Sequence, residues 1–291
     1  MAHITSLKIR EIWCVLDGKP GHDNQTLALA SSIAQLTGLS IHKVAADQSV
    51  QNPAKPVLAI GAGHSTHISL LKLQWLYGAK SIVLMRPSLP GFLFSLSIIP
   101  MHDRPLRTGT VLTSQGVLTS IKPANKNINT GTILIGGPTK SCPWEDIQLY
   151  EELDTLINTS PSDINWSMFT SRRTPKPTLS YLKSAFPELA IFSSSDKSSQ
   201  QLYSQLSCSE FSWVTSDSVN MVYESLTAEC KTGILLDQYH RGKISKQWDK
   251  LLHSNKLINI QQLLNGAASQ PSHNFNESHK IAPHIVKSFI Q

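Results

Sequence analysis

The feature that most constrains the fold is the regular alternation of short apolar runs with helical patterns. Runs of strand length lie at residues 11–17, 41–46, 57–63, 81–87, 94–100, 110–116, 131–137, 165–171, 189–194, 211–217 and 232–237. Amphipathic helical patterns lie at residues 24–36, 68–76, 144–157, 178–186, 198–206 and 218–230. Continuous apolar strands separated by helices are typical of parallel sheets buried on both faces. The sequence therefore predicts an α/β protein.

The length of 291 residues is about twice that of a usual domain, and a polar connector at residues 121–130 divides the pattern. We predict two Rossmann-like, doubly wound domains facing a cleft. The N-terminal domain takes residues 1–125 and the C-terminal domain residues 126–291, which includes a polar loop at 266–279 and a final helix. Ligands of open parallel sheets bind beyond the carboxyl ends of the strands. We therefore expect the functional site in the cleft.

The composition, 40% hydrophobic and 16% charged, excludes disordered and fibrous classes. Four cysteines lie far apart without zinc-site spacing, and no carboxylate or histidine motif for a metal occurs. We expect neither a metal nor a cofactor. Residues 1–11 lack the apolar segment of a secretory signal, and the most apolar stretch, residues 92–101, is too short to span a membrane. These features indicate a cytoplasmic protein.

The formal net charge of +6 favours anionic partners, which include phosphates, nucleic acids and acidic membrane surfaces. No concentrated stripe of Lys and Arg with interleaved aromatic residues occurs, so we expect no nucleic-acid partner. The expected partners are therefore phosphate-bearing ligands, together with peripheral contact at the inner face of a membrane.

The first apolar run ends in the segment DGKPGHDNQ, residues 17–25. Its glycines permit a tight turn, and the helix that follows offers free N–H groups to a phosphate, although a simple strand-to-helix turn explains the same pattern. His22 carries an imidazole and is a candidate general base, the alternative being an ordinary hydrogen-bonding residue. The substrate-binding candidates here are Gly18, Lys19, Gly21, Asn24 and Gln25.

Two further loops of the first half carry weaker signals. The segment GAGHST, residues 61–66, resembles the front of a dinucleotide fingerprint but has Thr66 at the third glycine position. A glycine turn before a helix capped by Ser65 is the plainer interpretation. His102 and Asp103 follow another strand, where the carboxylate could raise the basicity of the imidazole or cap the loop. We include both as catalytic candidates.

In the second half, Gly136 and Gly137 end a strand and offer backbone N–H groups to an anion. Arg172 and Arg173 end the next strand, where guanidinium groups suit phosphate oxygens; surface salt bridges are the alternative. Glu224 lies in the opening turns of a later helix and could accept hydrogen bonds from a ribose diol or form a salt bridge. The remaining candidates precede or open that helix, as phosphate ligands or as helix caps: Thr215, Ser216, Asp217, Ser218 and Met221.

Taken together, the segments DGKPGHDNQ, IGAG, PMHD, LIGGPTK, TSRRTP and VTSDSVNMVYES resemble the motif set of the mitochondrial fission ELM family, from about Trp13 to Leu236. Bacterial members of this family are described as glycosyltransferases or nucleotide-sugar epimerases, and the family resembles glycosyltransferases of the GT-B type. The resemblance implies that Arg172, Arg173, Ser216 and Ser218 hold a diphosphate and that Glu224 holds the ribose. His64 and Ser65 stand where the family usually has paired basic residues.

These observations lead to a function hypothesis with two alternatives. A metal-independent glycosyltransferase would move a sugar from a nucleotide-diphosphate donor to a hydroxyl acceptor in cell-envelope glycan or lipid biosynthesis, with His22 as base. Arg172, Arg173 and the helix terminus would stabilise the leaving diphosphate. A nucleotide-sugar epimerase would use the same cleft and would need acid/base groups on both faces of the sugar, one of which His102 with Asp103 could supply. A non-catalytic adaptor of the mitochondrial-fission type would keep the fold and bind a protein partner.

Overall fold

The computed structural model describes residues 10–47, 55–103, 105, 108–196, 199–242, 244–273 and 275–291. The chain forms two compact units. Unit 1 contains residues 1–120 and 276–291, and unit 2 contains residues 121–275. Residues 1–9, where we predicted no apolar leader, and residue 198, where we predicted a helix start, lie outside the described part.

Unit 1 is built on a six-stranded, all-parallel sheet in the order β2-β1-β3-β4-β5-β6. The strands are β1 (Arg10–Leu16), β2 (Ser40–Ala45), β3 (Lys55–Ala62), β4 (Lys80–Leu84), β5 (Leu96–Pro100) and β6 (Val111–Ser114). The helices are α1 (Pro20–Thr37), α2 (His67–Tyr77) and α9 (Glu277–Phe289), with short 3-10 turns η1 (His64–Thr66), η2 (Gly91–Leu93) and η3 (Met101–Asp103).

Side chains of β1 alternate between two cores, which shows that helices cover both faces of the sheet. Ile12 and Cys14 pack with residues of α1 and α9, whereas Trp13 and Val15 pack with Leu70 and other residues of α2. The fully buried apolar strands explain why the sequence reads as continuous hydrophobic runs.

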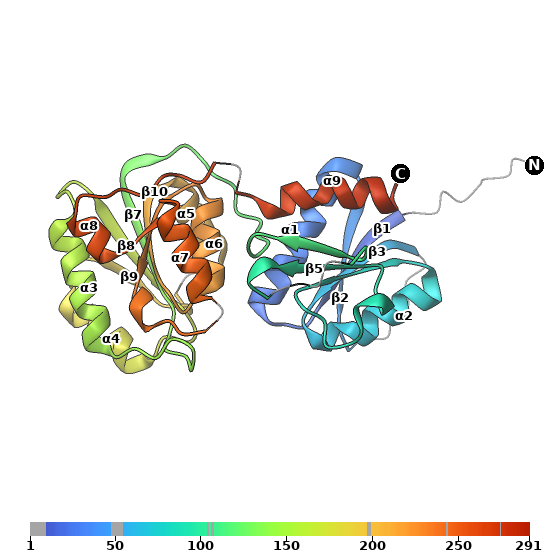
Figure 1. Ribbon diagram of the computed structural model, residues 1–291, viewed down its shortest axis with the longest axis horizontal. Helices are drawn as coiled ribbons and strands as arrows, with labels where there is room; N and C mark the ends of the chain where they lie inside the picture. The colour runs from blue at the N-terminus through green and yellow to red at the C-terminus, as the bar shows by residue number, and fades with distance from the viewer. Residues whose placement is uncertain are drawn as a thin grey trace, which may run out of the picture. The chain divides into compact units, whose positions relative to one another are not determined.

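Unit 2 is a second six-stranded, all-parallel sheet, in the order β12-β11-β10-β7-β8-β9. The strands are β7 (Asn127–Ile135), β8 (Asn165–Thr170), β9 (Ala190–Phe192), β10 (Ser209–Thr215), β11 (Lys231–Leu235) and β12 (Leu257–Ile258). The helices are α3 (Asp146–Thr159), α4 (Lys176–Ala185), α5 (Ser199–Cys208), α6 (Val219–Thr227), α7 (Ser245–His253) and α8 (Ile260–Leu264), with the 3-10 turn η4 (Asp237–Tyr239). Figure 1 shows helices on both faces of this sheet.

The predicted α/β class with two doubly wound Rossmann-like domains is confirmed for each unit. The structure differs from the predicted division at two points. Residues 121–125 belong to unit 2, and the C-terminal helix α9, predicted as part of the second domain, packs against α1 of unit 1 (Figure 1). The physical reason is that Ile281 and Ile285 of α9 complete the core around Leu29 and Ile33.

Polar contacts support this return of the chain to unit 1. The carboxylate of Glu277 accepts a hydrogen bond from the backbone N–H of Gln115 at 2.8 Å, and the Ser278 hydroxyl donates to the Thr119 carbonyl at 3.2 Å. Local sequence patterns carry no information on such contacts. The patterns also missed α7, β12 and α8, and the predicted connector at residues 121–130 runs into β7.

Candidate functional site

The loop after β1 and the loop after β3 meet at the topological switch point of unit 1. The chain starts its sheet at β1, places β2 on one side and β3 on the other, and then continues outward to β6. Connections that leave neighbouring strands in opposite directions open a crevice beyond their carboxyl ends, which is the usual ligand position in such sheets. Asp17 follows β1, and Gly63 and Ser65 follow β3.

Asp17 is the centre of this switch point. Its carboxylate, 2% exposed, accepts hydrogen bonds from His22 Nδ1 at 2.9 Å and from the Ser65 hydroxyl at 2.9 Å. The backbone N–H of Lys19 donates to it at 3.1 Å, and Lys19 Nζ lies 3.6 Å away. Burial by itself would raise the pKa of Asp17, but the hydrogen bonds from His22, Lys19 and Ser65 outweigh it and hold the pKa below its ordinary value. Asp17 is therefore a fixed anion at neutral pH.

Gly63 allows His22 and Asp17 to approach β3. Its φ of 84° lies in the left-handed region that side chains disfavour, and a Cβ placed there would lie 2.5 Å from His22 Nδ1. The predicted glycine turn is thus confirmed, but Ser65 is not the helix cap that we predicted. Its hydroxyl donates instead to the carboxylate of Asp17, which lies in the loop after β1.

The Asp17–His22 pair has the geometry of an oriented general base. Asp17 accepts the Nδ1 proton of the neutral imidazole, so Nε2 of His22 is left to accept a proton, and the ring is 24% exposed. The same loop is poorly suited to a phosphate, because Asp23 places a second carboxylate there. Its Oδ1 accepts the backbone N–H of Asp17 at 3.2 Å. Two carboxylates beside the start of α1 oppose the anion that we predicted for this turn.

The other predicted residues of this loop differ in accessibility. Gly18 occupies open space at a φ of 77°, Gly21 begins the first turn of α1, and Asn24 is half-buried. Gln25 is 4% exposed, and its side-chain N–H group donates to the Gly21 carbonyl at 3.1 Å. The Gln25 side chain is therefore buried in the core. A buried side chain is poorly placed to contact a ligand, which argues against the predicted role.

His102 and Asp103 are not an activated pair. Their nearest polar atoms lie 4.0 Å apart, and burial lowers the pKa of His102 although the Asp103 charge acts in the opposite direction. The predicted rise in basicity is therefore wrong, because desolvation of the imidazolium outweighs the attraction of a half-exposed carboxylate. The pair follows β5, which lies three strands from β1 in the sheet, or about 14 Å at the usual strand spacing. No described contact joins it to His22.

Unit 2 has its own switch point, between β7 and β10. The chain lays down β7, β8 and β9 in one direction, returns to place β10 on the other side of β7, and continues to β12. This is the strand order of a dinucleotide-binding Rossmann domain. Gly136 and Gly137 follow β7, and Thr215 ends β10 before the segment 216–218.

Asp217 is the centre of the unit 2 switch point. Its fully buried Oδ2 accepts hydrogen bonds from Arg173 Nη2 at 2.8 Å and from the Gly137 backbone N–H at 3.0 Å. Its second oxygen, Oδ1, is buried and has no hydrogen-bond partner among the described residues. A Cβ on Gly136 would lie 2.1 Å from Asp217, so this close approach requires glycine. The Asp217 carboxylate thus joins the loops after three strands.

Several residues that we predicted as ligand contacts instead form hydrogen bonds within the protein at this switch point. The backbone N–H groups of Gly136 and Gly137 are already donated to Thr215 Oγ1 and Asp217, so they are not offered to an anion. The Ser216 hydroxyl is fully buried and donates to the Leu236 carbonyl at 2.7 Å. Thr215 and Ser216 therefore hold loops together. Ser218 directly precedes α6, but its side chain does not cap that helix.

Exposed cations lie in the loops next to the buried Asp217, and one of them, Arg173, contacts it. Arg173 is 46% exposed, and Arg172 is exposed without a described ion pair. Arg241 is exposed, and its backbone N–H donates to the Ser141 carbonyl at 2.6 Å, which places it beside the loop after β7. The start of α6 adds the free N–H groups of its first turn. This arrangement suits a phosphate or diphosphate.

Glu224 and Met221 lie on α6. Met221 is half-buried in the first turn, and Glu224 lies one turn further on. Glu224 Oε1 accepts a hydrogen bond from the Tyr203 hydroxyl of α5 at 2.6 Å. Burial raises the pKa of Glu224 to about 7, although this hydrogen bond acts in the opposite direction. A carboxyl that is partly protonated at neutrality can donate as well as accept.

Sequence reasoning missed four residues at the two switch points: Asp17, Gly63, Ser65 and His240. His240 lies near Asp217, whose charge acts on it, and burial lowers its pKa; its Nδ1 is buried without a described partner. Asp17 could have been found, because a carboxylate that ends a strand and a histidine five residues later bracket a tight turn. Ser65 and His240 could not, since the carboxylates near them, Asp17 and Asp217, lie in loops that follow other strands.

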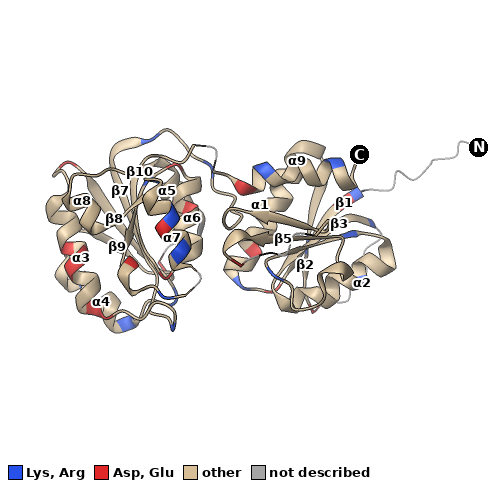
Figure 2. Ribbon diagram, viewed as in Figure 1, with Lys and Arg blue, Asp and Glu red and all other residues tan. Residues whose placement is uncertain are grey.

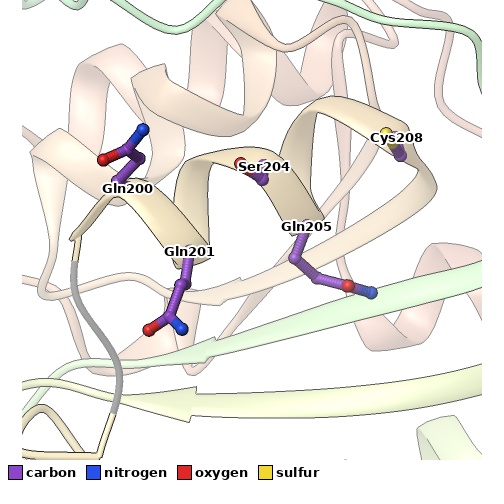
Figure 3. Close-up of a pocket in the computed structure, with 5 residues that line it drawn as sticks. All are labelled: Gln200, Gln201, Ser204, Gln205 and Cys208. Carbon is purple, nitrogen blue, oxygen red and sulfur yellow. The ribbon is translucent and has the colours of Figure 1, made fainter.

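Other features of the described residues do not compete with these two positions. A hollow of about 640 Å³ along α5 is lined by Gln200, Gln201, Ser204, Gln205 and Cys208, without a charged group (Figure 3). In the part of the chain that the structure describes, no cluster of His, Cys, Asp and Glu side chains could hold a metal ion. None of the described helices is long and apolar enough to cross a membrane.

Comparison with known proteins assigns the family. The model of the mitochondrial fission ELM1 family matches residues 20–289. The chain belongs to the mitochondrial fission ELM1 family. The match covers most of both units of this family member and begins three residues after Asp17. No curated protein sequence matches the chain significantly.

Solved structures show the same fold at low identity. UDP-GlcNAc 2-epimerase from Methanocaldococcus jannaschii is 9% identical, with 96% of this chain and 100% of that chain covered and a TM-score of 0.58. The same enzyme in complex with UDP-GlcNAc and UDP gives a TM-score of 0.53 at 9% identity, covering 96% and 99%. AviGT4, a glycosyltransferase of avilamycin A biosynthesis, gives 0.51 at 10% identity, covering 97% of each chain. At this identity the likeness shows the fold of this ELM1 family member.

Proposed function

We propose that the chain is a glycosyltransferase that moves a sugar from a nucleoside-diphosphate donor to a hydroxyl acceptor. The observation that carries the proposal is the arrangement at the unit 2 switch point. There Arg173 and the Gly137 backbone N–H donate to the buried carboxylate of Asp217, and exposed Arg172 is the neighbouring residue in the loop after β8. The start of α6 follows Asp217 directly after Ser218. Guanidinium groups stay charged and match phosphate oxygens. The family and the fold neighbours, which include proteins that act on nucleotide sugars, support the same assignment.

In this proposal each side chain has a defined task. Arg172 and Arg173 bind the diphosphate and stabilise the negative charge that develops as the bond from the sugar to the diphosphate breaks. Glu224 accepts a hydrogen bond from the ribose. His22 Nε2 takes the proton of the acceptor hydroxyl while Asp17 holds the ring by Nδ1, so the oxygen attacks the sugar as the nucleoside diphosphate leaves.

Binding of the donor can be tested before the acceptor is known. The free diphosphates of uridine, guanosine, cytidine and adenosine, and their sugars, are titrated calorimetrically against the native chain and Arg172→Ala. We expect one nucleotide to bind selectively and Arg172→Ala to weaken it about tenfold or more, since a charge-assisted contact contributes about 1.5–3 kcal/mol. Lys183→Ala, which removes an exposed cation from α4 of the same unit, is the matched control and leaves the affinity unchanged.

Three results would overturn the assignment. Absence of binding to any nucleotide at millimolar concentration would favour an adaptor that keeps the fold. Equal loss in Arg172→Ala and Lys183→Ala would indicate non-specific attraction. An epimerised sugar formed from the bound nucleotide sugar without any acceptor would assign an epimerase in place of a transferase.

A further inference from the structure

Helix α2 of unit 1 is apolar on both of its sides, yet only one side is covered. His67, Leu70 and Leu73 face the core. The opposite stripe consists of Ile68, Trp75 and Leu76, which are 57%, 84% and 60% exposed. A helix that is hydrophobic all round normally lies buried between two layers. The stripe on α2 is therefore an uncovered apolar surface whose burial in an apolar environment would be favourable.

The turn η2 extends this surface. Phe92 is 80% exposed and Leu93 37% exposed. Gln74 of α2 donates to the Leu93 carbonyl at 3.1 Å and accepts a hydrogen bond from the Ser95 hydroxyl, so η2 lies against the end of the helix. We call Ile68, Trp75, Leu76, Phe92 and Leu93 the α2–η2 patch. A groove of about 520 Å³ runs beside the helix part of this patch.

The charge around the patch is mainly positive. Residues 48–102 contain four Lys and Arg and no Asp or Glu, and α2 itself carries Lys72 and no acidic residue (Figure 2). Lys72, Lys80 and Arg86 are exposed, whereas Asp47 is the one acidic residue that lines the groove. Unit 1 contains 12 Lys and Arg against six Asp and Glu, and unit 2 contains 14 of each, so the whole net charge of +6 belongs to unit 1.

We propose that the α2–η2 patch is a membrane-binding surface that inserts Trp75, Leu76 and Phe92 into the interface of an anionic bilayer. Tryptophan beside aliphatic side chains with surrounding Lys and Arg is the composition that binds at the level of lipid headgroups. A second copy of the chain fits the surface less well. A symmetric dimer through this face would bring two units of charge +6 and two copies of Lys72 together. An anionic lipid surface neutralises these cations.

Vesicle sedimentation tests the proposal. The full chain is mixed with vesicles of phosphatidylcholine alone or of phosphatidylcholine with phosphatidylglycerol, at low and high salt. We expect binding to the anionic vesicles at least about tenfold tighter than to the neutral ones and weakened by salt. The double variant Trp75→Ser/Phe92→Ser loses this binding. The matched control Ile147→Ser/Leu264→Ser removes two exposed apolar side chains from unit 2 and retains it.

A charge variant keeps the test independent of folding. Lys72→Glu alters one exposed side chain and should weaken anionic-vesicle binding about tenfold, whereas Lys183→Glu in unit 2 should not. Failure of the native chain to bind anionic vesicles would overturn the proposal, as would retained binding in Trp75→Ser/Phe92→Ser or equal loss in the control variants. A native dimer that Lys72→Glu or Trp75→Ser/Phe92→Ser converts to a monomer would assign the patch to self-association instead.

Discussion

Each unit places a buried aspartate at its topological switch point, but the two aspartates have different partners. Asp17 of unit 1 accepts a hydrogen bond from the His22 imidazole, whose second ring nitrogen is left to accept a proton. Asp217 of unit 2 accepts one from Arg173, whose guanidinium stays charged. In the proposed function, the switch point of unit 1 would therefore transfer a proton and the switch point of unit 2 would bind negative charge. Four predictions test this contrast.

The largest effect is expected for Asp17→Asn. A neutral amide cannot stabilise the imidazolium that forms when His22 takes up a proton as general base. Turnover by the proposed transferase should therefore fall about 100-fold or more. Affinity for the nucleotide, which unit 2 would bind, should not change. Steady-state kinetics and calorimetry measure the two quantities, and Asp47→Asn, an exposed residue of unit 1, is the control. A loss of nucleotide affinity with intact turnover would reverse the roles of the two aspartates.

The next effect is expected for Gly136→Ala in unit 2. The new methyl group would lie 2.1 Å from Asp217 Oδ2, so the carboxylate must move and its bonds to Arg173 and Gly137 weaken. We expect the free energy of unfolding to fall by about 1–3 kcal/mol, as for other overpacked sites, together with weaker nucleotide binding. Denaturant unfolding measures the first. Gly109→Ala, where a Cβ would meet open space, should be neutral, and equal losses in both variants would contradict the role of Asp217.

Glu224 and Asp17 should have opposite effects on the pH dependence of stability. The pKa of Glu224 is raised from 4.5 to about 7, so between these values the folded chain holds a proton that the unfolded chain has lost. The contribution of Glu224 to the free energy of unfolding is therefore fully present below pH 4.5 and is lost as the pH rises to about 7. The pKa of Asp17 is lowered, so its contribution is present above pH 3.8 and is lost as pH falls through the folded value.

The thermal midpoint of Glu224→Gln measures this effect in unit 2. The difference from the native chain should grow in favour of the variant between pH 5 and 7 and then level off, because the amide has no charge to bury. Glu188→Gln changes an exposed carboxyl of the same unit and should give a difference that does not depend on pH. A difference for Glu224→Gln that is constant with pH would show that its carboxyl is not desolvated.

The smallest effect is expected for Ser65→Ala. It removes one of the hydrogen bonds to Asp17, so we expect a loss of about 0.5–1 kcal/mol in the free energy of unfolding and only a modest fall in turnover. Ser194→Ala, at an exposed position in unit 2, is the control for loss of a hydroxyl. A fall in turnover as large as that of Asp17→Asn would show that the β3 loop, and not Asp17, orients His22.

Much of the fold could be predicted from local patterns, because apolar runs and amphipathic periods reflect burial directly. All the predicted strands and helices exist, with ends displaced by a few residues. The site candidates Arg172 and Arg173 lie in the loop after β8 as expected, and His22 lies in the first turn of the helix that follows β1. The side-chain roles were less predictable. Ser216 and Thr215 were candidate ligands in the sequence. In the structure the Ser216 hydroxyl donates to the Leu236 carbonyl, and the Thr215 hydroxyl oxygen accepts from the Gly136 backbone N–H.

The sequence by itself determined the α/β class, the number of strand and helix patterns in most of the chain, and the loops where polar residues follow strands. Only the tertiary structure decided the strand order, which makes β3 the neighbour of β1 and β10 the neighbour of β7. That order brings Ser65 to Asp17 across 48 positions and Arg173 to Asp217 across 44. The physical reason is that periodicity records which side chains are buried, whereas strand neighbours and the docking of α9 are chosen by packing between segments far apart in the chain.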